Sequence, residues 1–278
     1  MNFNADDTRT RARVTISIRR DLLERVDNLI DGLTIRSRSQ AIEFLLSKFL
    51  GEKISVALVL AGGKPKDIKI GNTTKFLAKL GDKTLLEKVL EHLHGFGINN
   101  FLVYADYKSD ELIEHFEQLS LNYSVRFITG KKATGTAQPL IKARRFLKST
   151  FMLAYGDTIC RFNFDDMYRF HKSNNSIATL ALTSVDKPKR YGVAIVEGAK
   201  IKGFVEKPKT DVGSYLVNAG YFIFEPEFFT YIHKDDKSLE RHVFPRLAAQ
   251  GKLFAYPFQG LYLNVNTKAD LERAKLLL

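Results

Sequence analysis

The residues best suited to bind a ligand or catalyse a reaction are Ala61, Gly62 and Gly63, which directly follow an apolar run at residues 55–60. Glycine has no Cβ and permits φ > 0, so backbone there can approach a phosphate or a base closely. A strand that ends in a glycine pair and is followed by Lys75 fits a nucleotide site at the carboxyl end of a parallel sheet. An ordinary turn is the alternative at this point.

The rest of residues 54–278 supplies elements that could position such a site. Apolar runs alternate with stretches of helical periodicity, which predicts an α/β fold with a mainly parallel sheet and helices on both sides. Three short strands are expected within residues 191–224. The other predicted strands are 101–104, 125–128, 151–155 and 177–183, and the predicted helices are 84–96, 109–119, 136–147, 164–173, 239–250 and 267–278.

Eight different short motifs follow one another along the chain. In order they are LAGG at 60–63, TKFLAKLGDKTLLEKVL at 74–90, GTAQPL at 135–140, YGD at 155–157, YGVAIV at 191–196, FVEKP at 204–208, VNAGYFIFEPE at 217–227 and LYLNVNTKADLERA at 261–274. With this set and order, the chain resembles the sugar-1-phosphate nucleotidyltransferases, also called sugar-nucleotide pyrophosphorylases. The resemblance implies their Rossmann-like fold for residues 54–278.

In that family a sugar-1-phosphate oxygen attacks the α-phosphorus of a nucleoside triphosphate, and pyrophosphate leaves. Catalysis of such a step consists of positioning and cationic stabilisation. The resemblance implies a phosphate contact for Lys75 and Mg²⁺ ligation for Asp157. It also implies nucleotide contacts for Ala61, Gly62, Gly63, Gly135, Thr136 and Gln138, and sugar or phosphate contacts for Gly192, Glu206, Lys207 and Asn218.

The loop after the glycine pair departs from the family pattern, which continues as any residue, Gly, Thr, Arg. Here the same places hold Lys64, Pro65, Lys66 and Asp67, and the segment is shorter. Proline lacks an N–H donor, and Asp67 places an anion where a guanidinium would stabilise the transition state. Losing such an arginine costs on the order of 10³ in rate. The two lysines compensate only in part, because an ammonium lacks the bidentate fork of arginine.

The second metal position also departs from the family. Asn264 stands before Val265-Asn266-Thr267, where the family has an aspartate before Val/Ile-Gly-Thr. An amide oxygen is a weaker Mg²⁺ ligand than a carboxylate. Mg²⁺ remains the one candidate cofactor, at a degenerate site.

A separate module precedes this domain, at residues 12–51. Residues 13–18 alternate strictly, with Val14, Ile16 and Ile18 on one face, and predict a half-buried strand. Two helices are expected at 20–33 and 38–50, the second with Ser39 as N-cap. So small a module has too little core to bury its apolar faces alone and requires a partner.

Over residues 13–50 the module resembles the ribbon-helix-helix DNA-binding proteins, in which two chains pair their strands into a ribbon that enters the major groove. The resemblance implies a homodimer on double-stranded DNA. Arg13, Thr15 and Ser17 would face the bases, and Ser37, Arg38 and Ser39 would meet backbone phosphate. The alternative is a module used only for dimerisation.

Composition and charge bound the remaining possibilities. The chain has 278 residues, is 45% hydrophobic and has a formal net charge of +12. With no run of 18 apolar residues and no signal peptide, a cytoplasmic protein that spans no membrane is expected. Residues 1–11 are expected to form a flexible arm, and residues 51–53 a linker too short for free reorientation. Cys160 is expected to be a packed thiol, and His171, His233 and His242 surface or helix residues.

Three functions are compatible with this sequence. The favoured hypothesis is a dimeric DNA-binding transcriptional regulator whose second domain binds a nucleotide, sugar phosphate or sugar nucleotide with little or no turnover. The alternative is an active sugar-1-phosphate nucleotidyltransferase whose N-terminal module serves oligomerisation or autoregulation. A third hypothesis makes the large domain a spacer with an empty pocket.

Overall fold

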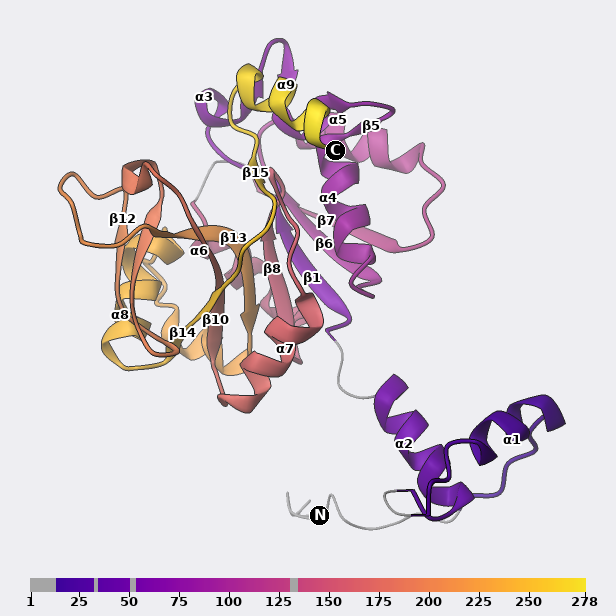
Figure 1. Cartoon of the computed structure of the whole chain (residues 1–278). Helices are drawn as coiled ribbons and strands as arrows, with labels where there is room; N and C mark the ends of the chain where they lie inside the picture. The colour runs from indigo at the N-terminus through magenta and orange to yellow at the C-terminus, as the bar shows by residue number, and fades with distance from the viewer. Residues whose placement is uncertain (1–13, 33–34, 51–53, 131–134) are drawn as a thin grey trace, which may run out of the picture. The chain divides into compact units, whose positions relative to one another are not determined.

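A computed structural model of the chain describes residues 14–32, 35–50, 54–130 and 135–278. The chain divides into two compact units, residues 1–53 and residues 54–278 (Figure 1). The expected flexible arm, the linker at 51–53 and Arg13 lie outside the described residues. Each unit is described by itself.

The N-terminal unit contains two helices, α1 (Arg20–Asp27) and α2 (Arg38–Leu50). The Arg38 guanidinium joins them through hydrogen bonds of 2.7 and 2.8 Å to the two carboxylate oxygens of Asp27. Helix α1 is shorter than predicted because the N–H groups of Leu29 and Ile30 bond to carbonyls three residues back, which tightens the chain into a turn. Apolar spacing continues through that turn, so periodicity alone could not locate the helix end.

The start of α2 also differs from the prediction. The Ser37 hydroxyl accepts the backbone N–H of Gln40 at 3.3 Å, so Ser37 rather than Ser39 has the N-cap role. Ser39 already lies inside the helix.

Residues 14–19 do not form the predicted half-buried strand in the single chain. The side chains of Val14, Ile16 and Ile18 are 74%, 55% and 36% exposed. An extended segment becomes a strand only when a second strand accepts and donates its hydrogen bonds, and none of the described residues does so. The strand predicted from the alternation is therefore not formed among the described residues of the single chain.

The large unit is built on a nine-stranded mixed sheet with the order β10-β14-β12-β11-β13-β8-β1-β6-β7 (Figure 1). Its parallel part consists of β7, β6, β1 and β8, in which Leu58 of β1 lies between Leu102 and Leu153. Strands β1, β6 and β8 are near-continuous apolar runs because both of their faces are covered, whereas the edge strand β7 is partly exposed and carries Arg126. These four strands are β1 (Val56–Leu60), β6 (Asn100–Ala105), β7 (Ser124–Thr129) and β8 (Phe151–Tyr155).

The other five strands pair mostly antiparallel, so the expectation of a mainly parallel sheet holds only for the first part. Strand β13 runs antiparallel to both β8 and β10, and the hairpin of β11 and β12 attaches to it. Only β10 and β14 are parallel here. These strands are β10 (Ala178–Ser184), β11 (Gly192–Glu197), β12 (Lys200–Glu206), β13 (Leu216–Phe224) and β14 (Leu253–Pro257).

Two apolar cores lie on the two faces of this sheet. Helices α4 (Leu85–His94), α5 (Ser109–Glu117), α7 (Phe164–Ser173) and α9 (Lys268–Leu277) contribute to one. Helices α6 (Ala137–Ala143) and α8 (Phe244–Ala249) contribute to the other. Thr84 begins α4 with a capping box in which its hydroxyl and the Glu87 carboxylate accept each other's backbone N–H.

Short elements complete the unit. They are α3 (Pro65–Ile68), β2 (Lys69–Ile70), β3 (Thr73–Thr74), β4 (Lys79–Leu80), β5 (Lys83–Thr84), β9 (Thr158–Cys160), β15 (Tyr262–Asn264), the 3₁₀ turns Lys75–Leu77, Arg144–Phe146, Pro188–Arg190 and Pro226–Tyr231, and the π turn Leu239–Val243. Cys160 is buried, as expected of a packed thiol, and burial raises the pKa of its thiol. No helix within the described residues is long and apolar enough to cross a membrane.

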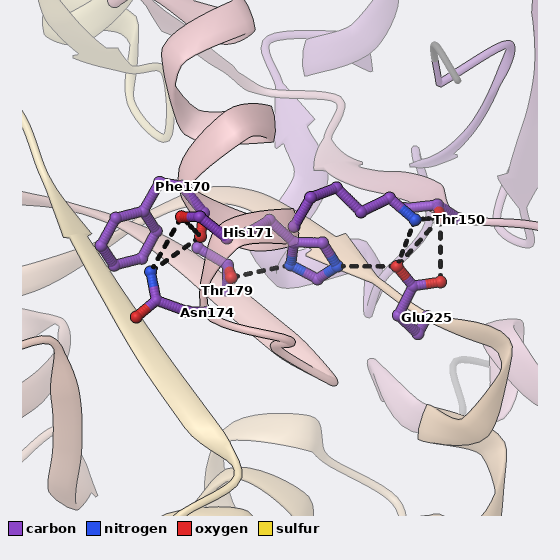
Figure 2. Close-up of polar contacts among 8 residues, drawn as sticks. Thr150, Phe170, His171, Asn174, Thr179 and Glu225 are labelled. Carbon is purple, nitrogen blue, oxygen red and sulfur yellow. Dashed lines mark hydrogen bonds and ion pairs between the residues drawn. The ribbon is translucent and has the colours of Figure 1, made fainter. Parts of the chain in front are cut away.

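His171 lies on α7 but is fully buried rather than on the surface (Figure 2). Its Nδ1 is 2.8 Å from the Thr179 hydroxyl, and its Nε2 is 3.3 Å from a Glu225 carboxylate oxygen. That carboxylate also accepts from Lys172 Nζ at 2.8 Å and from the Thr150 hydroxyl. The sequence could not show this cluster because its members come from four separate segments.

Candidate functional site

A cavity of about 630 Å³ opens where β1, β6 and β8 end. It is the kind of crevice in which open α/β sheets bind ligands. Seven of the residues predicted for the site line it, namely Gly62, Gly63, Lys75, Gly135, Thr136, Asp157 and Lys207. The other lining residues are Leu60, Lys64, Lys66, Asp67, Ile68, Phe76, Tyr104, Asp106, Pro139, Tyr155 and Asn266.

The glycine loop is held by a carboxylate that sequence reasoning missed. One oxygen of Asp106 accepts the N–H of Gly63 at 2.8 Å and the N–H of Tyr107 at 2.6 Å. A Cβ at Gly62 would lie 3.0 Å from the same carboxyl group, so a side chain there would crowd it. Asp106 follows β6 directly, at the sheet edge where the loop after β1 also lies, and that placement was the available signal.

The divergent loop folds into the single-turn helix α3, with Pro65 in its first turn, where a missing N–H is tolerated. The N–H of Asp67 bonds to the Lys64 carbonyl at 2.8 Å. This N–H is therefore used inside the turn, and Pro65 has none. Lys64, Lys66 and Asp67 all line the cavity, so its wall here presents two ammonium groups and one carboxylate.

Lys75 is buried and already paired. Its Nζ lies 2.5 Å from Asp157 Oδ2 and donates to the side-chain oxygen of Asn266 at 2.7 Å. Only 4% of Lys75 is exposed. The turn after β3 positions the lysine, and the end of β8 positions the aspartate. Asn266 is a second site residue that was not predicted, although it lies within the motif at 261–274 that differs from the family pattern.

Asp157 and Asn264, the two residues predicted for a metal, are brought together because β15 pairs with β9 and the Val265 N–H bonds to the Asp157 carbonyl at 2.8 Å. The Asn264 side-chain oxygen accepts from the Asn266 amide. Among the described residues no group of three His, Cys, Asp or Glu side chains could hold a metal. This donor set fits Mg²⁺ only in part: one carboxylate, shared with Lys75, and one amide would need phosphate oxygens from a ligand.

The wall formed by the start of α6 is tied to the segment around residue 237. The Thr136 hydroxyl donates to a Glu240 oxygen at 2.6 Å and accepts the Leu239 N–H at 2.9 Å. Gly135 has φ +78°, and a Cβ there would lie 2.1 Å from the Lys237 carbonyl oxygen. Gly135 therefore cannot be replaced without moving this wall.

Gln138, predicted to contact the nucleobase, does not line the cavity. Its side-chain N–H₂ donates to the carbonyl oxygens of Lys234 and Asp236 at 3.1 and 2.9 Å. Its amide therefore holds the segment that faces α6. Ala61 is buried beneath the loop and likewise does not line the cavity.

The predicted sugar side is a partly buried polar group centred on Glu240. This carboxylate accepts from the Tyr155 hydroxyl, and burial followed by the charge of Glu240 raises the pKa of Tyr155 well above its usual value. Burial and Glu240 also raise the pKa of Glu206. No motif marks Glu240, so sequence reasoning had no means to find it.

Of the residues predicted for the sugar, Lys207 alone lines the cavity. Asn218 is buried and its side-chain oxygen accepts the Gly220 N–H at 2.8 Å. A Cβ at Gly192 would lie 2.5 Å from the Phe204 ring, so this glycine is required by packing. Gly192, Glu206 and Asn218 thus do not line the cavity.

The predicted DNA-contacting residues are all exposed where they are described. Thr15, Ser17, Ser37 and Ser39 are exposed, and Arg38 is exposed while paired with Asp27. Ser37 is engaged at the start of α2, and Arg38 links α2 to α1 through Asp27.

Comparison with protein families gives two matches. The nucleotidyl transferase family matches residues 56–262, and the ribbon-helix-helix proteins of the copG family match residues 12–53. A curated relative, the mannose-1-phosphate guanylyltransferase catalytic subunit beta of Xenopus tropicalis, is 32% identical over 226 residues. The protein of the same name from Dictyostelium discoideum is 30% identical over 225 residues. Each match covers 77% of this chain and 62% of the relative, so the chain spans 62% of their length.

Solved structures show the same fold at lower identity. HddC from Yersinia pseudotuberculosis superposes with a TM-score of 0.69 and 22% identity, covering 81% of this chain and 99% of that one. A UDP-glucose pyrophosphorylase complexed with UDP-glucose gives a TM-score of 0.69 and 17% identity, covering 81% of this chain and 98% of that one.

Proposed function

Because the chain belongs to the nucleotidyl transferase family and carries a ribbon-helix-helix domain, we propose that it is a DNA-binding transcriptional regulator with a ligand-sensing second domain. In this proposal the large unit binds a nucleotide, sugar phosphate or sugar nucleotide with little or no turnover. Two copies of the chain form the DNA-binding unit, because pairing two strands into a ribbon would bury the exposed apolar row of Val14, Ile16 and Ile18. Such a regulator acts in the compartment that holds its DNA.

The observation that carries this proposal is the wall made by α3. Pro65 and Asp67 stand where the family has a glycine and an arginine, and Asp67 lines the cavity. A carboxylate there repels the charge that accumulates on the α-phosphate during transfer, while the cavity volume remains sufficient for a ligand of nucleotide size. Binding is thereby favoured over reaction.

Ligand binding regulates DNA affinity only if the free energy of binding DNA differs between the ligand-bound and the ligand-free protein. The two units share one chain, so a ligand that shifts the arrangement of two paired chains would change how well their shared ribbon meets the operator. A coupling free energy of about 1–3 kcal/mol would change operator affinity by roughly 5- to 150-fold.

The test begins with selection of an operator from a randomised duplex library by the full-length chain. Fluorescence anisotropy then gives affinity for that duplex with and without GTP, GDP-mannose and mannose 1-phosphate. A several-fold change with at least one of these ligands supports the proposal. Thr15→Ala/Ser17→Ala, which leaves the cavity intact, should lose preference for the operator. Equal affinity for the operator and a scrambled duplex in the unaltered chain would remove the DNA-reading role.

A second candidate function is an active sugar-1-phosphate nucleotidyltransferase, and one observation favours it. Lys75 and Asp157, the residues implied for phosphate and metal, both line the cavity. Pyrophosphate release from a nucleoside triphosphate and a sugar 1-phosphate distinguishes the candidates. Release at rates of about 1 s⁻¹ or more, abolished in Asp157→Ala, would establish the enzyme. Release at least about 10³-fold slower supports the sensor.

A further inference from the structure

An uninterrupted basic segment lies in the large unit, far in sequence from the ribbon-helix-helix domain. Residues 118–156 contain seven Lys or Arg residues and no Asp or Glu. The whole chain has a formal net charge of +12, so this segment carries more than half of the excess. Ordinary solvated surfaces mix both signs, and a long stretch of one sign indicates a surface for an anionic partner.

The fold brings two of these arginines, Arg126 and Arg145, together at one aromatic ring. Arg126 lies on β7, the strand at one edge of the nine-stranded sheet, and its guanidinium carbon is 5.1 Å from the centre of the Phe146 ring. Arg145 lies over the same ring at 4.6 Å. One aromatic side chain therefore holds two guanidinium groups of like charge, from elements about 20 residues apart in the chain.

A third arginine is held in the same manner. The Arg144 guanidinium lies 5.5 Å from the centre of the Phe229 ring. Arg126, Arg144, Arg145 and Lys148 are all exposed, and within the described residues none of them forms an ion pair with a carboxylate. Like charges without counter-charges repel one another, so this arrangement favours a bound polyanion.

We propose that Arg126, Arg144, Arg145 and Lys148, the basic face, bind the phosphate backbone of double-stranded DNA without reading its sequence. Guanidinium groups stacked on rings have lost part of their rotational freedom before binding, and their planar forks match phosphate oxygens. The basic face is distinct from the cavity, because none of these four residues lines it.

The partner assignment rests on the proposed function. DNA held by the ribbon-helix-helix domain stays at a high effective concentration for any second site on the same chain, so weak phosphate contacts become significant. The sequence-independent contacts of the basic face would add affinity at any sequence, whereas Thr15 and Ser17 would supply the preference for one sequence.

The experiment measures the salt dependence of binding by the full-length chain. Anisotropy of a labelled scrambled duplex is followed between about 50 and about 200 mM salt for the unaltered chain and for Arg126→Gln/Arg145→Gln. Each lost phosphate contact reduces the slope of log K against log salt by about 0.9, so the double variant should show a slope smaller by about 2. The unaltered chain then loses roughly tenfold more affinity than the variant over this range.

A matched control, Arg169→Gln/Arg273→Gln, removes two exposed arginines elsewhere, one on α7 that pairs with Asp166 and one on α9. Its slope should stay close to that of the unaltered chain, and circular dichroism should show that all three proteins are folded. Equal slopes for the two double variants would overturn the proposal. Retention of duplex affinity with loss of single-stranded RNA binding would also overturn it, because the partner would then be RNA.

The same experiment separates this inference from the proposed function. If the ribbon-helix-helix domain reads no operator, selected and scrambled duplexes bind equally, yet the slope difference between the two double variants persists. If the basic face is inert, operator preference persists and the slope difference vanishes.

Discussion

Charge placement at single residues decides what the cavity can hold. Asp106 and Asp67 put carboxylates on two of its walls, while Lys64 and Lys66 put ammonium groups beside them. In the Lys75–Asp157 pair the lysine is buried and the aspartate partly buried, and removing one partner of such a pair is usually far more costly than removing both.

Lys75→Met should therefore destabilise the large unit by roughly 3 kcal/mol, since it leaves the Asp157 carboxylate without its cation. Urea unfolding followed by circular dichroism measures the change. Lys75→Met/Asp157→Leu should recover much of the loss. A double variant as unstable as the single one would show that the pair contributes through packing rather than charge.

Asp106→Asn should strengthen binding of a nucleoside triphosphate. The asparagine oxygen can still accept the N–H of Gly63, so the loop keeps its support, while the negative charge on the cavity wall is lost. Repulsion of about 1–2 kcal/mol corresponds to roughly tenfold in Kd, measured by isothermal titration calorimetry. The control is Asp165→Asn, an exposed carboxylate at the start of α7. Unchanged affinity in Asp106→Asn would place the phosphates away from this wall.

Individual elements show how far the sequence could be interpreted. Strands β1, β6, β8 and β10 were predictable because buried apolar runs between polar turns have few other uses. Lys75 and Asp157, which were singled out by their motifs, both line the cavity. Asp106, Glu240 and the His171 cluster were missed because each depends on contacts between segments that the sequence keeps far apart. A strand was predicted at 13–18, but no described residue pairs with the part of it that the structure describes.

The cluster in Figure 2 joins α7 to the sheet and should make stability depend on pH. Burial lowers the pKa of His171 to about 4, so the unfolded chain takes up a proton near pH 6.5 that the folded chain refuses until about pH 4. Although burial opposes it, hydrogen bonding from Lys172 and Thr150 lowers the pKa of Glu225 overall. Both shifts have the same sign, so stability is present near neutral pH and declines on acidification.

Substituting His171 should flatten this dependence. Between pH 6.5 and about 4 the unaltered chain should lose roughly 2–4 kcal/mol through this group. His171→Asn, which cannot take up a proton, should lose clearly less over the same interval, even if it is less stable at pH 7. Urea midpoints at a series of pH values measure it. Parallel curves for the two proteins would mean that His171 titrates normally in the folded state.

At the scale of the whole molecule, the proposed dimer can be tested at the exposed apolar row of Val14, Ile16 and Ile18. Ile16→Lys places a charge in the apolar row and should convert a dimer into a monomer in sedimentation equilibrium at micromolar concentration. DNA affinity should fall with it, because one ribbon needs two strands. Thr15→Ala is the matched control and should remain dimeric. A dimer that survives Ile16→Lys would place the interface elsewhere.

The internal pairing of Lys75 has a further consequence for a receptor. A phosphate that recruits this ammonium group must first displace the Asp157 carboxylate, so the net affinity is lower than an open lysine would give. If the large unit is the proposed sensor, its weaker binding would let ligand occupancy change with ligand concentration, whereas a tighter site would stay saturated.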